Sequence, residues 1–176
     1  MISSRLLMVS ARLVLPTVLL PAYDVVVELI SAKVPLCGGF HTRLERNCLG
    51  ILLHGPQHIT ICPARDFAPG DRLYSGSLWA EVKRGVAEGR VSIQPPPGVK
   101  GTRITRENAE VRNAYLLEIA DRILVLSANE GSRTAAMAHT ALARGMPVFV
   151  MDHPSNRHLL DAGAQIATIE ALTASE

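Results

Sequence analysis

The chain has 176 residues, of which 48% are hydrophobic and 4% aromatic, and its formal net charge is +2. This length and composition suit one domain whose core is built mainly from aliphatic side chains. The mild charge argues against a strongly basic nucleic-acid coat protein, although arginines can still gather on one face. Cys37, Cys48 and Cys62 fit no metal-ligand spacing and are expected to be buried thiols in a reducing compartment.

The apolar stretch near the N-terminus is not expected to enter a membrane. Its longest uncharged run, residues 13–23, is too short to span a bilayer and contains Pro16 and Pro21. No cleavage site for a secretory signal stands out. We therefore expect a cytoplasmic protein without a membrane anchor.

Short apolar runs alternate with amphipathic stretches through the first half of the chain, which is typical of a parallel sheet crossed by helices. The predicted strands are residues 5–9, 34–37, 59–62 and 89–93. The predicted helices are residues 21–32, a segment from Thr42 that stops at Gly55, and a segment capped by Ser77 that runs to Glu88.

Gly38 and Gly39 directly follow the second predicted strand and precede a helix. Such a junction can face an anion, because the first amides of a helix have no partner within it. The alternative is a tight turn, which needs a glycine in any case.

Residues 99–106 are expected to form a loop that carries Lys100, Arg103 and Arg106. These cations either track a phosphate backbone or form a solvated surface, and the sequence leaves both options open. Thr105 is predicted to cap the helix that follows.

The second half of the chain contains the most informative segment, a predicted strand–turn–helix–strand unit over residues 123–151. Gly145 should end its helix in a left-handed conformation. In the turn before the helix, Gly131 allows close approach to the backbone, and the hydroxyls of Ser132 and Thr134 can bind phosphate or carboxylate. The alternative is an ordinary turn in which Ser132 serves only as the helix cap.

A short helix from Asn156 to Gly163 and an edge strand over residues 165–169 complete the predicted elements. Together they predict a single α/β domain, residues 1–171, with a Rossmann-like, doubly wound, mainly parallel sheet and helices on both faces. Residues 172–176 are expected to be a frayed tail.

Several of these elements resemble, in order, the core of the DNA-processing protein A family (DprA, also called Smf). The matching segments are Arg112-Asn113, Glu130-Gly-Ser-Arg-Thr134, residues 145–150 and residues 155–164 with Asn156. The end of the first strand, with Ser10 and Arg12, stands where that family has a Gly-Ser-Arg sequence.

This resemblance implies binding of single-stranded DNA or a nucleotide, with no covalent chemistry. The residues themselves lead us to expect no metal site and no cofactor. The implied phosphate or nucleic-acid contacts are Ser10, Arg12, Gly38, Gly39, Arg112, Asn113, Glu130, Gly131, Ser132, Arg133, Thr134 and Asn156. It also implies a role in DNA recombination during natural transformation, transfer of the strand to a RecA-type recombinase, and a homodimer.

Part of the pattern is shared with the cytokinin-activating phosphoribohydrolases (LOG family), which hydrolyse a nucleotide glycosidic bond. Those enzymes have a Pro-Gly-Gly-x-Gly-Thr-x-x-Glu turn, and here Thr134 and Ala135 stand where carboxylates would be. General acid–base work on a glycosidic bond needs a placed carboxyl group, and Glu130 lies one turn too early. Binding is therefore favoured over hydrolysis, and sensing of a small nucleotide in the same cleft is a third option.

Overall fold

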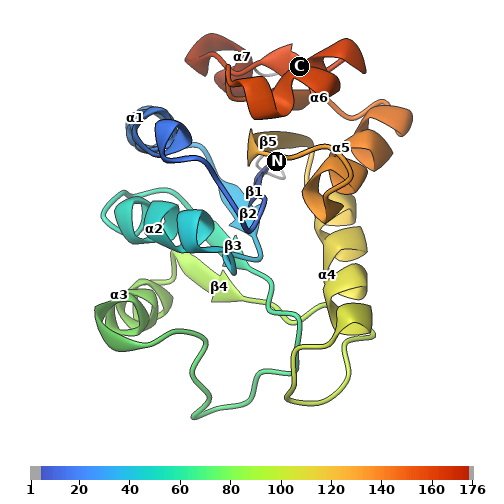
Figure 1. Cartoon of the computed structure of the whole chain (residues 1–176). Helices are drawn as coiled ribbons and strands as arrows, with labels where there is room; N and C mark the ends of the chain where they lie inside the picture. The colour runs from blue at the N-terminus through green and yellow to red at the C-terminus, as the bar shows by residue number, and fades with distance from the viewer. Residues whose placement is uncertain (1–4, 175–176) are drawn as a thin grey trace.

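Within residues 5–174, which the computed structural model describes, seven strands form one sheet with the order β4-β3-β2-β1-β5-β6-β7 (Figure 1). Every pair of neighbouring strands is parallel. The strands are β1 (Leu6–Ser10), β2 (Leu36–Gly38), β3 (Ile59–Ile61), β4 (Val91–Ile93), β5 (Arg122–Ser127), β6 (Val148–Val150) and β7 (Gln165–Ile166).

Helices cover both faces of this sheet, as Figure 1 shows with α1, α2 and α3 on one side and α4 and α5 on the other. The α-helices are α1 (Leu19–Ser31), α2 (Arg43–Leu52), α3 (Gly76–Ala87), α4 (Arg106–Ile119), α5 (Arg133–Ala143), α6 (Arg157–Asp161) and α7 (Ile169–Thr173). Two 3-10 turns, η1 (Pro16–Val18) and η2 (Pro154–Asn156), precede α1 and α6. The predicted Rossmann-like α/β fold is confirmed.

Alternation along the central strands divides the core into two layers. Leu6 and Met8 of β1 pack with the layer under α1, α2 and α3, whereas Leu7 and Val9 pack with the layer under α4 and α5. All four side chains are buried, because a parallel strand is covered on both faces.

The order of the strands reverses between β1 and β5, and this reversal positions the site. The chain winds outward from β1 to β4, returns through α4 to place β5 beside β1, and then winds the other way to β7. The register between β1 and β5 shifts after Val9, so that Ser10 pairs with Ser127. Such an irregularity at the carboxyl ends of two diverging strands is typical of the place where ligands bind in these sheets.

Two predicted details are wrong. The cap of α3 is Ser75 rather than Ser77, because the helix already begins at Gly76. The last strand ends at Ile166, and α7 then extends over part of the segment predicted to be frayed. Thr168 caps this helix and Leu172 is fully buried against the layer that contains α1, which gives the segment a reason to be ordered. Residues 175–176 lie outside the described part of the chain.

Across residues 5–174, none of the helices combines the length and the apolar character that crossing a bilayer requires.

Candidate ligand-binding site at the carboxyl edge of the sheet

A cavity of about 510 Å³, called the edge cavity below, opens at the carboxyl edge of the sheet beside the β1–β5 reversal. Its walls come from the ends of β1 and β3, the start of α2, the loop over residues 63–75, and the sides of α4 and α5. Seven of the residues that the sequence marks as contacts line it: Ser10, Arg12, Gly39, Arg112, Asn113, Arg133 and Thr134. The other five, Gly38, Glu130, Gly131, Ser132 and Asn156, are not among its lining residues.

Arg112 forms the floor of the edge cavity from the second turn of α4. Only 3% of the residue is exposed, and its Nε donates to Asn113 Oδ1 at 2.9 Å. Its two terminal nitrogens make no hydrogen bond to any residue of the described chain. Burial lowers the pKa of Arg112, although the nearby Glu45 carboxylate opposes that effect. A buried guanidinium with free donors is costly unless a ligand or another partner accepts from it.

The absence of a side chain at Gly39 leaves the space that the Arg112 guanidinium occupies. An ideal Cβ on Gly39 would lie 2.8 Å from Arg112 Cζ, so any larger residue would collide with the guanidinium. At Gly38 the fit is tight but less severe, since an ideal Cβ would lie 3.1 Å from both Met8 O and Phe40 Cε2. The twin glycine therefore makes room for the protein's own side chains. Phe40 is fully buried with φ 44, a strained conformation for a bulky residue and a common feature of functional sites.

Glu45 is a buried charged residue of the cavity that the sequence did not mark as a candidate contact. It is 1% exposed, and its Oε1 accepts from Ser10 N at 2.8 Å while its Oε2 accepts from His41 N at 2.9 Å. His41 Nδ1 lies 3.1 Å from the same Oε2. Burial alone would raise the pKa of Glu45, but the hydrogen bonds and charge of His41 and the backbone amides outweigh it and hold the pKa below the ordinary value.

A local signal for Glu45 was present in the sequence. Thr42 and Glu45 stand three residues apart at the start of α2, the spacing of a capping box. The structure shows that box complete, with Thr42 Oγ1 accepting from Glu45 N at 3.2 Å. The signal marks a helix start, however, and does not reveal that the same carboxylate reaches across to the end of β1.

The first two residues of α5, Arg133 and Thr134, line the cavity, whereas Gly131 and Ser132 of the preceding turn do not. Ser132 is an N-cap whose Oγ accepts from Ala135 N at 3.1 Å, and its own amide donates to Asn129 O at 3.0 Å. The next two amides, of Arg133 and Thr134, make no hydrogen bond within the described chain, as expected for the first turn of a helix. Both of these residues line the edge cavity.

Asn156 does not line the cavity but holds the turn that follows β5. It is fully buried, its Oδ1 accepts from Ala128 N at 2.8 Å, and its Nδ2 donates to Met151 O at 3.0 Å and Leu126 O at 3.3 Å. These bonds fix the turn after β5 against the end of β6. Its polar atoms are thus used within the protein, and its role is to hold the turn in shape.

Three arginines on the walls of the cavity, called the rim arginines, are exposed and unpaired within residues 5–174: Arg12, Arg46 and Arg133. Two further arginines of the cavity are engaged. Arg65 holds the loop over residues 63–75 through Asp71 Oδ2 at 3.2 Å, and Arg106 pairs with Glu110 at 3.0 Å. Glu45 is the single acid among the described lining residues, so the rim is positive.

The cysteines are buried free thiols, as expected. Burial raises the pKa of Cys62 to about 12 and that of Cys48 to about 12, which makes both poor nucleophiles. No group of three potential metal-ligand side chains occurs among the described residues.

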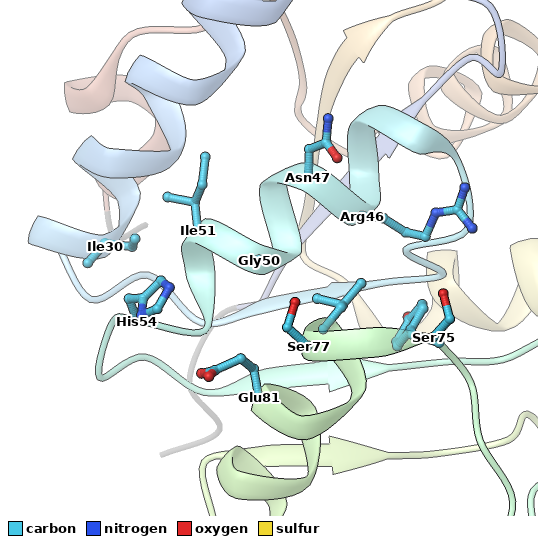
Figure 2. A pocket seen from close by; sticks show the side chains of 11 residues that line it. Ile30, Arg46, Asn47, Gly50, Ile51, His54, Ser75, Ser77 and Glu81 are labelled. Carbon is cyan, nitrogen blue, oxygen red and sulfur yellow. The ribbon is translucent and has the colours of Figure 1, made fainter.

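A second hollow, of about 940 Å³, is lined by residues of α2 and α3 and by Ile30 near the end of α1 (Figure 2). Figure 2 shows α2, with Asn47, Gly50 and Ile51, running beside α3, with Ser77 and Glu81. It lies away from the strand reversal and has no buried charged group among its lining residues. We therefore assign the candidate site to the edge cavity.

The architecture and the position of this cavity define a Rossmann-like protein with a cavity at the point where strand order reverses, the place where ligands typically bind in such sheets. The chain is similar to DNA processing protein A from Helicobacter pylori, described as binding single-stranded DNA, with a TM-score of 0.75 and 14% identity over 97% of this chain and 79% of that one. It is similar to DprA from Streptococcus pneumoniae with a TM-score of 0.72 and 13% identity over 98% of this chain, which spans 62% of the pneumococcal protein.

A third similar structure is the molybdenum cofactor binding protein from Rippkaea orientalis, with a TM-score of 0.60 and 13% identity over 94% of this chain and 90% of that one. At these identities the likeness shows a shared fold. No family model matches the sequence. No curated protein matches it either.

Proposed function

We propose that this protein binds single-stranded DNA or a nucleotide through phosphate groups at the edge cavity, without covalent chemistry, as a DprA-like protein of DNA processing. The observation that carries the proposal is the start of α5. Arg133 and Thr134 both line the cavity there, their amides make no hydrogen bond within the described chain, and the Arg133 side chain is unpaired.

The charge at this helix start favours an anionic ligand. Partial positive charge accumulates at the N-terminus of a helix, so Arg133 as the first residue of α5 is electrostatically unfavourable there. The first turn of α5 has no acidic residue to offset it. A bound phosphate would be stabilised by the helix, by the amides of Arg133 and Thr134, and by the rim arginines together.

The structural likeness to DprA proteins of two bacteria supports the same proposal at the level of the fold. We extend it to the properties that the sequence resemblance implies: action in the cytoplasm during natural transformation, a homodimer, and transfer of the strand to a RecA-type recombinase. Each of these extensions depends on strand binding being present first.

Hydrolysis of a glycosidic bond is the less supported alternative. The carboxylate that faces the cavity is Glu45, and its oxygens already accept from the amides of Ser10 and His41. Its lowered pKa makes it a weak proton acceptor at neutral pH.

The test is a titration of an oligonucleotide at several salt concentrations. Removing one phosphate contact should reduce the slope of log affinity against log salt by about 0.7 for a single strand. We expect this reduction for Arg12→Ala and for Arg133→Ala, because both side chains line the cavity and are unpaired.

Arg144→Ala is the matched control, because Arg144 is an exposed arginine at the opposite end of α5. It should leave the slope unchanged. Equal slopes for all three variants, or no binding at low salt, would contradict phosphate binding at this edge.

A further inference from the structure

The floor of the edge cavity carries two opposite charges that are not in contact with each other. Arg112 and Glu45 are 3% and 1% exposed, and both line the cavity. No ion pair within 4.0 Å joins them among the described residues, although the charge of Glu45 acts on Arg112. Two buried charges that face a common space without meeting leave room for a group between them.

The hydrogen-bonding capacity of the two side chains defines that group. The terminal nitrogens of Arg112 are donors without acceptors in the described chain, and Glu45 Oε1 accepts only from Ser10 N, so it can accept once more. A fitting ligand therefore presents an acceptor to Arg112 and, beside it, a donor to Glu45.

A phosphate does not meet this requirement, because it offers no donor and would be repelled by an ionised carboxylate. The lowered pKa of Glu45 keeps that carboxylate ionised at neutral pH. The exposed rim arginines carry no such penalty, so phosphates are favoured at the rim and a neutral polar group at the floor.

We propose that the floor of the edge cavity binds the edge of one nucleobase, with Arg112 donating to a ring nitrogen or carbonyl and Glu45 accepting from an exocyclic amino group. This inference rests on the proposed function and adds the orientation of the ligand: the base points inward and the phosphate lies at the rim. Arginine and carboxylate side chains pair with base edges in this way in nucleic-acid complexes.

The size and walls of the cavity suit a single base. Its volume of about 510 Å³ is in the range of small-molecule pockets, and Arg112 closes it at one end. Leu73, Tyr74 and Ile104, which are partly or fully exposed, supply apolar surface against which a heterocycle can pack. A splayed base of a flexible strand and the base of a free nucleotide share this chemistry.

Glu45 predicts a preference among bases. Cytosine places an amino group next to ring acceptors, whereas thymine places carbonyl oxygens on both sides of its single ring N–H, and these would face the carboxylate. Oligodeoxycytidylate should therefore bind about tenfold more tightly than oligodeoxythymidylate of the same length. An abasic strand of that length should bind no better than the thymidylate.

Glu45→Gln tests the residue directly. Two amides, of His41 and Thr42, donate to Oε2, and one, of Ser10, donates to Oε1. The amide oxygen of the variant should therefore stay at the Oε2 position, and its NH₂, at the position of Oε1, should lose the bond from Ser10 N and be unable to accept from a base. The variant should lose the tenfold preference for cytidylate. Arg133→Ala, a rim variant, should weaken both strands and keep the ratio between them.

The measurement is fluorescence anisotropy of labelled strands, together with calorimetric titration of cytidine monophosphate, uridine monophosphate and ribose 5-phosphate. Equal affinity of the unmodified protein for cytidylate, thymidylate and abasic strands would overturn base recognition and leave phosphate binding intact.

If strands fail to bind but cytidine monophosphate is preferred over the other two small ligands, base recognition stands with a free nucleotide as its source. If nothing binds, both proposals are wrong. Because the comparison of bases uses the unmodified protein, it does not depend on whether Glu45→Gln folds.

Discussion

At the scale of single residues, Gly39 is required for the position of Arg112. Replacing it with alanine should displace the guanidinium from the floor of the cavity, and because the displaced group is the flexible end of a side chain that borders the cavity, the loss of stability should be small. Ligand binding should weaken as well, since Arg112 would no longer lie at the floor of the cavity. Thermal unfolding and the oligonucleotide titration measure the two effects.

Gly50→Ala provides the matched comparison for that experiment. An ideal Cβ at Gly50 has Leu78 Cδ1 as its nearest neighbour, at 4.0 Å, and the position lies within α2. Alanine should stabilise the helix there by about 0.5–1 kcal/mol. It should also leave ligand binding unchanged, because Gly50 does not line the edge cavity. If Gly50→Ala weakens binding as much as Gly39→Ala does, the account of Gly39 is wrong.

Glu45 should make the free energy of unfolding of the protein depend on pH in the acidic range. Its pKa in the folded protein lies below the ordinary value of 4.5, so in acid the unfolded chain binds the proton first. Its contribution is therefore present above about pH 4.5 and is lost as the pH falls through the folded pKa. Denaturant unfolding across that range should show a smaller loss on acidification for Glu45→Gln than for the unmodified protein. An identical loss in both would show that other carboxylates cause it.

At the scale of elements, two helices begin with a serine at the N-cap position, but only one of these serines makes a side-chain capping hydrogen bond. Ser132 Oγ accepts from Ala135 N at 3.1 Å, whereas Ser75 makes no side-chain cap bond at the start of α3. Ser132→Ala should cost about 1 kcal/mol, and Ser75→Ala should change the stability very little. Urea unfolding of the two variants checks the difference. A loss of equal size for both would mean that the Ser132 bond is not formed in solution.

At the scale of the whole molecule, the two layers of the core share one sheet and should unfold together. Trp79, the chain's single tryptophan, is buried in the layer under α3, whereas Leu116 is buried in the opposite layer under α4. Leu116→Ala should cost about 2–5 kcal/mol. That loss should shift the transition seen by Trp79 fluorescence as much as the transition seen by circular dichroism. If the fluorescence transition stayed in place while the other moved, the layers would be separate folding units.

The sequence by itself determined the class of the fold and most of its elements. Apolar runs of strand length that alternate with capped helices can be buried together only as a parallel sheet with helices on both faces, and local caps such as Thr105 and Gly145 mark where helices begin and end. The short helix over α7 was missed, because its order comes from the burial of Leu172 against a distant part of the chain.

Only the tertiary structure decided the composition of the site. Residues 39, 45, 112 and 133 lie on four different segments, and what brings them together is the winding of the chain around β1 and β5. The sequence gives no distance between a carboxylate at the start of α2 and the amide of Ser10, or between Gly39 and a guanidinium on α4. Those contacts depend on which strands are neighbours, and strand order is a property of the packed sheet rather than of any local pattern.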